Sequence, residues 1–190
     1  MKKMIMMLVI LFLTACSSRS EIVPLQLHIP HSTAAEDATS SIIQEIETLY
    51  LTPSWAVFYQ NENELEAAAD LVIHGKAAYR VNSSFVEGDI STYHTNTQVT
   101  ILDVIKEDSI PVDNSIIVSQ MGGTFGNLHV VSAATTLLQE NQEAMLFLRR
   151  NSDGTYRPIN EDDGVYMKID DTFQNIATKS ILRTDNYTIQ

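Results

Sequence analysis

The chain has 190 residues, of which 44% are hydrophobic and 19% charged, a size that fits one globular domain with a targeting segment and a tether. Its 24 acidic and 12 basic residues give a formal charge of −12, which argues against a nucleic-acid binder, because neutralising phosphates needs clustered Lys and Arg. Cys16 is the only cysteine, so no disulfide can form within the chain.

The first fifteen residues have the features of a bacterial export signal. Lys2 and Lys3 give a positive start, and residues 4–13 are apolar throughout, too short a run for a bilayer span of about 20 residues. The next stretch, Leu13–Cys16, resembles the lipobox of bacterial lipoproteins, in which the cysteine receives a lipid and the chain is cut before it. The resemblance predicts a signal peptide over residues 1–15 and lipidation of Cys16. The alternative is an ordinary secretory signal.

Lipidation would attach the mature protein to a membrane on the extracytoplasmic side. Several acyl chains, such as palmitate, would hold it, because one chain alone binds membranes only marginally. Ser17 follows the cysteine, which resembles an outer-membrane sorting context in cells with two membranes, so the cell membrane and the outer membrane both stay open. Without Lys2 and Lys3, 10 basic and 24 acidic residues remain, a formal charge of −14.

A tether follows the predicted lipid site. Residues 16–35 contain many Ser, Thr, Pro and Ala residues, and Pro24 and Pro30 interrupt any regular element, which predicts a flexible linker. The alternation of Leu25, Leu27 and Ile29 leaves a short docked strand as the alternative. Residues 36–190 are predicted to form a single, mostly β domain with N-terminal helices.

Two helix signals open this domain. Ser41 and Gln44 have the spacing of a capping box, and apolar residues then recur at helical spacing from Ile42 to Tyr50, before Pro53. The second signal is Asn61 with Glu64, which predicts a short helix that continues to Ala69.

The apolar period then changes from 3.6 to 2, which indicates two long strands. In residues 71–81 the side chains expected to point inward are Leu71, Ile73, Ala77, Tyr79 and Val81, and those on the polar face are His74, Lys76, Arg80 and Asn82. After a loop at Glu87–Asp89, the return strand alternates from Tyr93 to Ile101 and then changes phase to Leu102 and Val104. The phase change predicts a β-bulge near Ile101.

Shorter strands follow at close spacing, at residues 115–121, 128–131, 144–148 and 165–169. The turns between them are marked by Pro111, Gly122-Gly123, Asn141 and Asp153-Gly154. Together these signals predict a mainly β, α+β fold with one or two short helices, arranged as a small antiparallel barrel of the oligonucleotide/oligosaccharide-binding (OB) kind, with a β-sandwich as the alternative.

Three segments carry a family resemblance: Ala69–Lys76, Gln120–Gly123 with Gly126, and Gln142–Leu148. Together they resemble a recurrent bacterial extracytoplasmic domain of unknown function, from Trp55 to Ile169. Asn141-Gln142 departs from that family, which often has a glycine there, and leaves the turn type open. The layout is also similar to the OB-like barrel of netrin modules and tissue inhibitors of metalloproteinases. The inhibitors act through a disulfide-tethered N-terminal cysteine, and this mechanism does not carry over because Cys16 is the expected lipid site.

No metal site is predicted. Pro30 separates His28 from His31 and prevents a helical pairing, and no other ligand type lies nearby. His74 and His94 are expected to lie roughly 26 Å apart, since eight residues of strand separate them at about 3.3 Å each. The acidic stretches Glu161–Asp163 and Asp170-Asp171 lack the spacing of a calcium loop and are interpreted as solvated turns.

No catalytic or cofactor motif is predicted either. The sequence contains no Gly-x-Ser-x-Gly, no cysteine beside a histidine and no Ser-x-x-Lys in a plausible setting, and Gly122–Gly126 lacks the Lys of a phosphate-binding loop. Trp55, Phe58 and Tyr59 are expected to pack in the core, with a ligand surface as the alternative. Arg149-Arg150 is interpreted as a strand end that reaches solvent.

The sequence therefore favours a lipid-anchored, non-catalytic binding or interaction module of the envelope. Its partners would be the membrane, through the lipid on Cys16, and an envelope protein or glycan of unknown identity, but no nucleic acid. A structural or stress-related envelope factor is the alternative. An enzyme is the weakest hypothesis and depends on the polar residues His74, Arg80 and His94.

Overall fold

The computed structural model describes residues 45–87, 92–107 and 114–182, which belong to one compact unit of the chain. The predicted signal peptide, Cys16, the tether, the His28/His31 pair and Pro111 lie outside the described residues. Within the described part of the chain, no helix is both long and apolar enough to cross a membrane.

The fold is mainly β, with strands making up 57% of the described residues. The strands are β1 (Glu47–Leu51), β2 (Leu71–Val86), β3 (Thr92–Glu107), β4 (Ser115–Met121), β5 (Gly123–Phe125), β6 (Leu128–Ser132), β7 (Glu143–Arg150), β8 (Tyr156–Pro158), β9 (Val165–Ile169) and β10 (Thr172–Asn175). The helical elements are α1 (Glu62–Ala68) and a 3-10 turn, η1 (Glu161–Gly164). A β-rich α+β fold, as predicted, is therefore confirmed.

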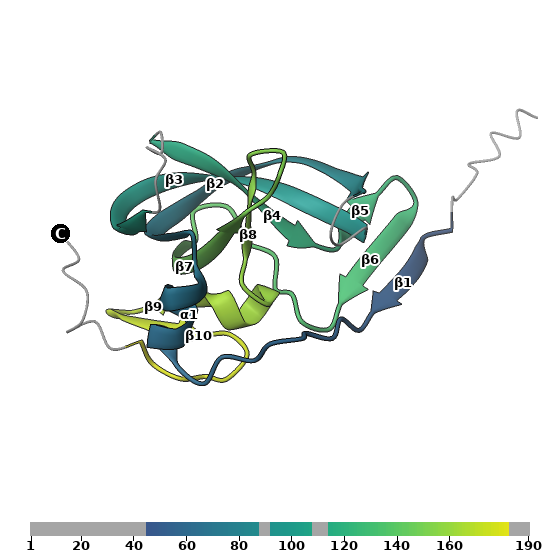
Figure 1. Ribbon diagram of the computed structural model, residues 1–190. Helices are drawn as coiled ribbons and strands as arrows, with labels where there is room; N and C mark the ends of the chain where they lie inside the picture. Colours follow the sequence, from purple (N-terminus) through teal and green to yellow (C-terminus); the bar gives the residue numbers. More distant parts are fainter. Residues whose placement is uncertain (1–44, 88–91, 108–113, 183–190) are drawn as a thin grey trace, which may run out of the picture. The chain divides into compact units, whose positions relative to one another are not determined.

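Five strands form a closed ring within the larger of two sheets. That sheet has the order β10-β9-β7-β2-β3-β4-β8, and β8 pairs with β7 as well as with β4, which joins β2, β3, β4, β8 and β7 into the ring (Figure 1). The β4–β8 contact is one parallel pair, Val118 with Tyr156, whereas β7 and β8 are antiparallel over three residue pairs. The second sheet has the order β1-β6-β5.

The first half of β2 and the middle of β7 bury side chains on both of their faces. Inside the ring lie Leu71, Ile73, Val99, Val118 and Leu146. On the outer side, Val72, Met145 and Phe147 pack with side chains from α1, β9 and β10. Because other side chains cover both faces of β7, its sequence is a continuous run of apolar residues rather than an alternation of apolar and polar ones.

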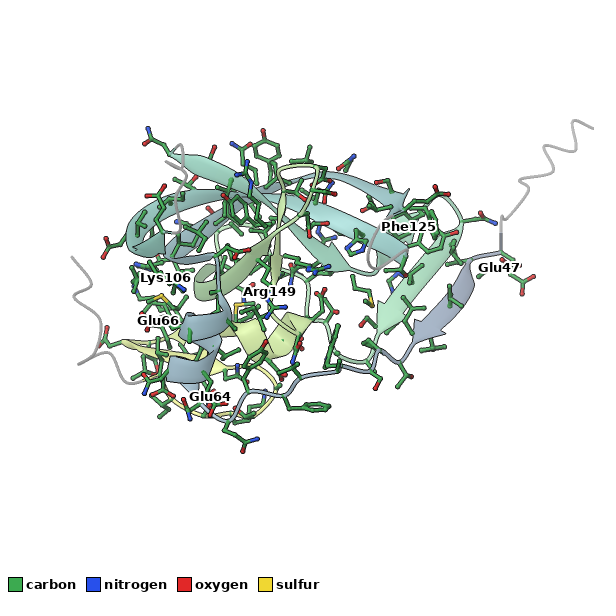
Figure 2. All side chains as sticks on the ribbon, viewed as in Figure 1. Glu47, Glu64, Glu66, Lys106, Phe125 and Arg149 are labelled. Atoms are coloured by element: carbon green, nitrogen blue, oxygen red, sulfur yellow. The ribbon has the colours of Figure 1, made fainter. Side chains whose placement is uncertain are left out.

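The start of α1 agrees with the sequence signal. Asn61 Oδ1 accepts a hydrogen bond from the backbone N–H of Glu64 at 3.1 Å, and Glu64 Oε2 accepts one from the N–H of Gln60 at 2.9 Å. At its other end, Lys106 Nζ donates to the carbonyls of Glu66 and Ala69 at 2.9 and 2.6 Å (Figure 2). A cation at this end favours the helix because its last carbonyls carry partial negative charge.

The helix predicted from Ile42 to Tyr50 is wrong for the part that the structure describes, which begins at residue 45. Residues 47–51 form strand β1, which pairs in parallel with β6, about eighty residues further along the chain. The periodicity of a short stretch of sequence cannot detect a partner so far along the chain. Most of β1 is exposed, so a helix here would have no buried face to stabilise it, and the strand pairing prevails.

The inward and outward assignments on β2 and β3 are partly wrong. Leu71, Ile73 and Ala77 are buried as predicted, but Tyr79 and Val81 are 55% and 49% exposed, and His74, predicted on the polar face, is buried. The reason is that β7 pairs with β2 only from Leu71 to Lys76, so the rest of β2 lacks that neighbour.

The predicted bulge is confirmed. The register of β2 and β3 passes from Gly75 opposite Ile101 to His74 opposite Asp103, which leaves Leu102 unpaired. Leu102 and Val104 are exposed, contrary to the predicted inward phase. The strands at 115–121 and 165–169 agree in their bounds, whereas the short strands β5, β8 and β10 were not predicted.

Two valines on β2 test the burial of both faces. Val72 is fully buried and Val81 is half exposed, although both lie in the same strand. Val72→Ala should lower the free energy of unfolding by about 2 kcal/mol, because it removes buried methyl groups and leaves a cavity. Val81→Ala should change it by less than about 0.5 kcal/mol. Denaturant unfolding measures both values, and equal effects would contradict this assignment of faces.

Candidate functional site

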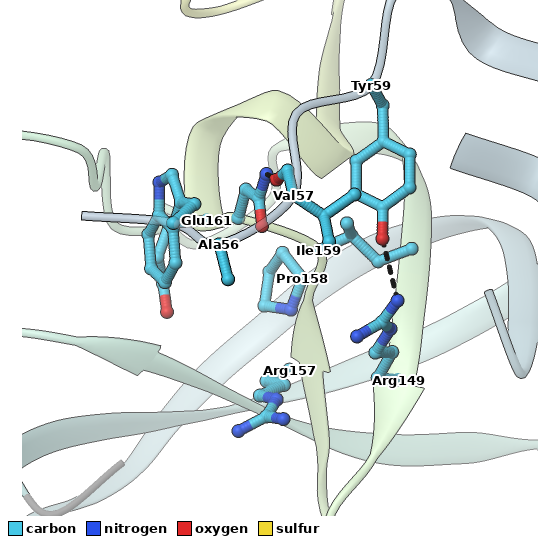
Figure 3. Close-up of a pocket in the computed structure, with 10 residues that line it drawn as sticks. Ala56, Val57, Tyr59, Arg149, Arg157, Pro158, Ile159 and Glu161 are labelled. Carbon is cyan, nitrogen blue, oxygen red and sulfur yellow. Dashed lines mark hydrogen bonds between the residues drawn. The ribbon is translucent and has the colours of Figure 1, made fainter. Parts of the chain in front are cut away.

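A hollow of about 170 Å³ lies beside the closing strand of the ring, and we call it the Trp55 pocket (Figure 3). One wall comes from the segment between β1 and α1, residues 52–61, which we call the strap; the other comes from β7, β8 and the turn into η1. The lining residues are Trp55, Ala56, Val57, Tyr59, Arg149, Arg157, Pro158, Ile159, Asn160 and Glu161.

Hydrogen bonds hold the strap in place. Arg149 Nη2 donates to the Tyr59 hydroxyl at 2.7 Å, as Figure 3 shows, and Arg149 Nε donates to the carbonyl of Ala68 at 3.3 Å. Asn160 Nδ2 donates to the carbonyl of Val57 at 2.9 Å. As predicted, β7 ends at this pair and Arg150 is exposed, but Arg149, on the opposite face of β7, is only partly exposed because its guanidinium contacts the strap.

The aromatic residues of the strap do not all pack in the core. Phe58 is 66% exposed, so core packing is wrong for this residue. Tyr59 is partly buried and packs against the outer core cluster, as predicted, and it also lines the pocket. Trp55 is partly buried and lines the pocket, which favours the alternative of a ligand surface for this residue. The strap has no regular structure between residues 52 and 60, so its side chains do not follow a strand alternation.

Glu161 is a buried acid at the base of the pocket. Its Oε2 accepts hydrogen bonds from the N–H of Met121 at 3.2 Å and from Thr135 Oγ1 at 3.3 Å. Asn160 and Glu161 have left-handed backbone angles, which turn the chain sharply after β8. Burial raises the pKa of Glu161 to about 8, because a charged carboxylate is poorly solvated there. At neutral pH this carboxyl group is therefore mainly neutral.

Asp162 is the second buried acid of η1. It accepts hydrogen bonds from the N–H and the hydroxyl of Thr136 at 2.6 and 2.9 Å. Burial is the largest influence on it and raises its pKa above the usual value. The prediction of a solvated turn is thus wrong for Glu161 and Asp162, but it holds for Asp170 and Asp171, which are exposed in the turn between β9 and β10.

Both histidines of the predicted strand pair are buried, contrary to expectation. His74 Nε2 lies 3.4 Å from Glu143 Oε2, the oxygen that also accepts a hydrogen bond from Lys168 Nζ at 2.8 Å. That hydrogen bond is the main reason that the pKa of Glu143 is lowered.

The histidines do not form a site together. His74 lies opposite Asp103 on β3, and His94 is nine residues away along that strand, opposite Ser84. Arg80 lies between them in register, opposite Thr97, so the three residues behind the enzyme hypothesis occupy separate positions. Among the residues that the structure describes, no group of three His, Cys, Asp or Glu could hold a metal ion.

A second hollow, of about 320 Å³, adjoins the Trp55 pocket. Its lining residues are Leu51, Thr52, Pro53, Ser54, Trp55, Thr92 and Met121. Trp55 lines both hollows, and the Met121–Glu161 hydrogen bond joins a residue of one to a residue of the other. The two hollows therefore share the Trp55 side chain as a common wall.

The sequence did not single out Arg157 or Glu161 as site residues. Arg157 lies in a strand of three residues, too short for an alternation to be recognised, and Glu161 lies in an acidic run that is typical of solvated turns. Comparison of the chain with known protein families, curated proteins and solved structures finds no match. The site is therefore interpreted from its own residues.

The buried carboxyl of Glu161 predicts a loss of stability as the pH rises. Its folded pKa of about 8 lies above the usual value of 4.5, so the folded state binds more protons between these values, and the free energy of unfolding falls there by up to about 1.4 kcal/mol per pH unit. Glu161→Gln keeps an oxygen that can accept from Met121 but does not titrate. Between pH 5 and 8 its unfolding free energy should fall less steeply than that of the unmodified protein.

The control for this measurement is Glu140→Gln, at an exposed position. Denaturant unfolding at several pH values should give the unmodified slope for this variant. Identical slopes for all three proteins would show that Glu161 does not titrate as proposed.

Proposed function

We propose that this chain is a lipid-anchored, extracytoplasmic protein whose β domain is a non-catalytic binding module of the bacterial envelope, with its ligand in the Trp55 pocket. The anchor is supported by the sequence, in which a positive start and an apolar run precede Leu13–Cys16. The membrane that receives the lipid would be the cell membrane or the outer membrane, depending on the host envelope.

The arrangement of the ring supports an OB-like barrel rather than a sandwich. The OB-fold is a five-stranded, partly open barrel. Here each of the five strands pairs with two others of the ring, and the pairing of β4 with β8, at the single pair Val118–Tyr156, is the shortest, which suits a partly open barrel. The bulges between β2 and β3 provide the curvature that closure needs.

The observation that carries the binding function is the Trp55 pocket itself. Concave sites lined by aromatic and apolar side chains with a few polar groups are the usual form of ligand sites. The pocket combines an indole, a phenol and two guanidinium groups with four apolar residues, and its ten lining residues include no serine, cysteine or histidine. This composition suits recognition better than nucleophilic catalysis.

The anchor is tested by Cys16→Ser. The variant should lose incorporation of a labelled fatty acid and should appear in the soluble extracytoplasmic fraction, because the acylated sulfur would be absent. Ser17→Ala is the matched control and should remain labelled and membrane-bound. Labelling of the Cys16→Ser protein would contradict the anchor.

The pocket is tested by Trp55→Ala. Immobilised full-length protein should retain a saturable component from envelope protein or glycan fractions, and Trp55→Ala should reduce this retention at least about tenfold, because aromatic anchors dominate binding energy. Trp55→Phe keeps an aromatic ring and should retain most of the binding.

Phe58→Ala is the control for Trp55→Ala, because Phe58 lies in the same strap but does not line the pocket. It should bind as the unmodified protein does. Unfolding midpoints of all variants separate loss of binding from loss of fold. Equal retention by a folded Trp55→Ala protein would contradict the pocket as the binding site.

A further inference from the structure

Neither arginine of the Trp55 pocket has a carboxylate oxygen within 4.0 Å among the described residues, although the protein is acidic. Within the described residues, the ion pairs closer than 4.0 Å all involve Glu143, which lies outside the pocket. Arg149 donates to the Tyr59 hydroxyl and to a carbonyl, both of which are neutral. The backbone of Arg157 pairs with β7, but within the described part of the chain its guanidinium makes no hydrogen bond, so these donors are available to a ligand.

The acid of the pocket does not neutralise these cations at physiological pH. Glu161 interacts electrostatically with Arg157, but burial raises the pKa of Glu161 to about 8, so this carboxyl is mainly neutral near pH 7. Its neighbour Asp162 is bonded to Thr136 and does not line the pocket. The charged residues that line the pocket are two arginines and Glu161, so the pocket is net positive near pH 7.

We infer that the Trp55 pocket binds a carboxylate-bearing sugar, with the carboxylate on Arg157 and the ring against the Trp55 indole. This inference rests on the proposed function and names the ligand class of the same site. A guanidinium presents paired N–H donors that match a carboxylate, which makes arginine the usual partner for this group.

The other lining residues suit the rest of a sugar ring. Asn160 Nδ2 already donates to the carbonyl of Val57 and to Asp163 Oδ2, so Asn160 offers a sugar hydroxyl its Oδ1 as an acceptor, whereas the neutral carboxyl of Glu161 has a proton to donate. Ala56, Val57 and Pro158 offer apolar surface to the C–H groups of the ring. The volume of about 170 Å³ suits one ring rather than a large ligand, and the second hollow beyond Trp55 provides room for a neighbouring unit of a glycan chain.

The overall charge favours a single carboxylate over a polyanion. With 24 acidic residues in the chain, a densely charged polymer would be repelled at long range. One carboxylate is attracted instead by the local field of Arg157 and Arg149, which act at contact distance.

Trp55 gives a direct readout, because it is the only tryptophan in the chain. Its intrinsic fluorescence is measured on the full-length protein in detergent micelles during titration with D-glucuronate or with D-glucose, at constant ionic strength and pH 7. We expect glucuronate to bind at least about tenfold more tightly than glucose, since a hydrogen bond to a charged group contributes more than one between neutral groups.

Arg157→Gln should abolish this preference and bring the affinity for glucuronate down to that for glucose. Arg150→Gln is the matched control, since Arg150 is exposed on β7 and does not line the pocket, and it should keep the preference. Unfolding midpoints of both variants confirm that they are folded.

The other outcomes overturn the inference in distinguishable ways. Equal affinities for the two sugars would show a neutral-sugar site and leave the binding module standing. A response to the C-terminal carboxylate of N-acetyl-alanyl-alanine but not to glucuronate would assign the site to peptide ends. No response to glucuronate together with Trp55-dependent retention of an envelope component would overturn the ligand class alone. If glucuronate gives no fluorescence response and the retention of envelope components does not depend on Trp55, the proposed binding pocket is overturned as well.

Discussion

The closure of the five-stranded ring by β8 is the constraint on which the rest of the structure depends. This strand has three residues, yet it contacts β4 through Tyr156 and β7 through three pairs, so the chain must turn immediately after it. The turn uses left-handed residues and a hydrogen bond from the N–H of Ile159 to the carbonyl of Phe147 at 2.9 Å. Gly164 completes it, because a Cβ there would lie within 2.9 Å of the backbone of both residues.

Because the turn is so tight, it places two carboxyl groups inside the protein, and there they organise a segment that has no regular structure of its own. Glu161 and Asp162 accept hydrogen bonds from Thr135 and Thr136, and the buried Gln120 bonds to the backbone of Thr136 and Leu138. Buried polar groups without partners would be costly, so these bonds fix the path of residues 132–138. The same burial keeps Glu161 neutral, and the electrostatics of the pocket thus follow from the packing of the fold.

The pocket is formed where this turn meets the strap. Tyr59 and Val57 are fixed by Arg149 and Asn160, which lie about ninety to a hundred residues later in the chain. The N-terminal end of the strap is fixed by the pairing of β1 with β6. Trp55 lies between these two attachments, so its indole is positioned by contacts at both ends. In the proposed function, Arg149, which holds the strap, and Arg157, which binds the ligand, belong to the ring, and the aromatic surface belongs to the strap.

The sequence by itself determined the local features: the cap of α1 at Asn61, the long strands, the bulge near Ile101, the bounds of β4 and β9, and the mainly β class. It also carries the prediction of a lipid on Cys16, since a targeting motif is read from adjacent residues. Only the tertiary structure decided what depends on distant partners. The parallel pairing of β1, the burial of Glu161 and His74, and the exposure of Tyr79 and Phe58 all follow from which elements cover which face. Arg149, Arg157 and Trp55 line one pocket for the same reason. Hydrophobic burial and strand pairing act between residues far apart in the chain, whereas sequence periodicity reflects only residues close together in it.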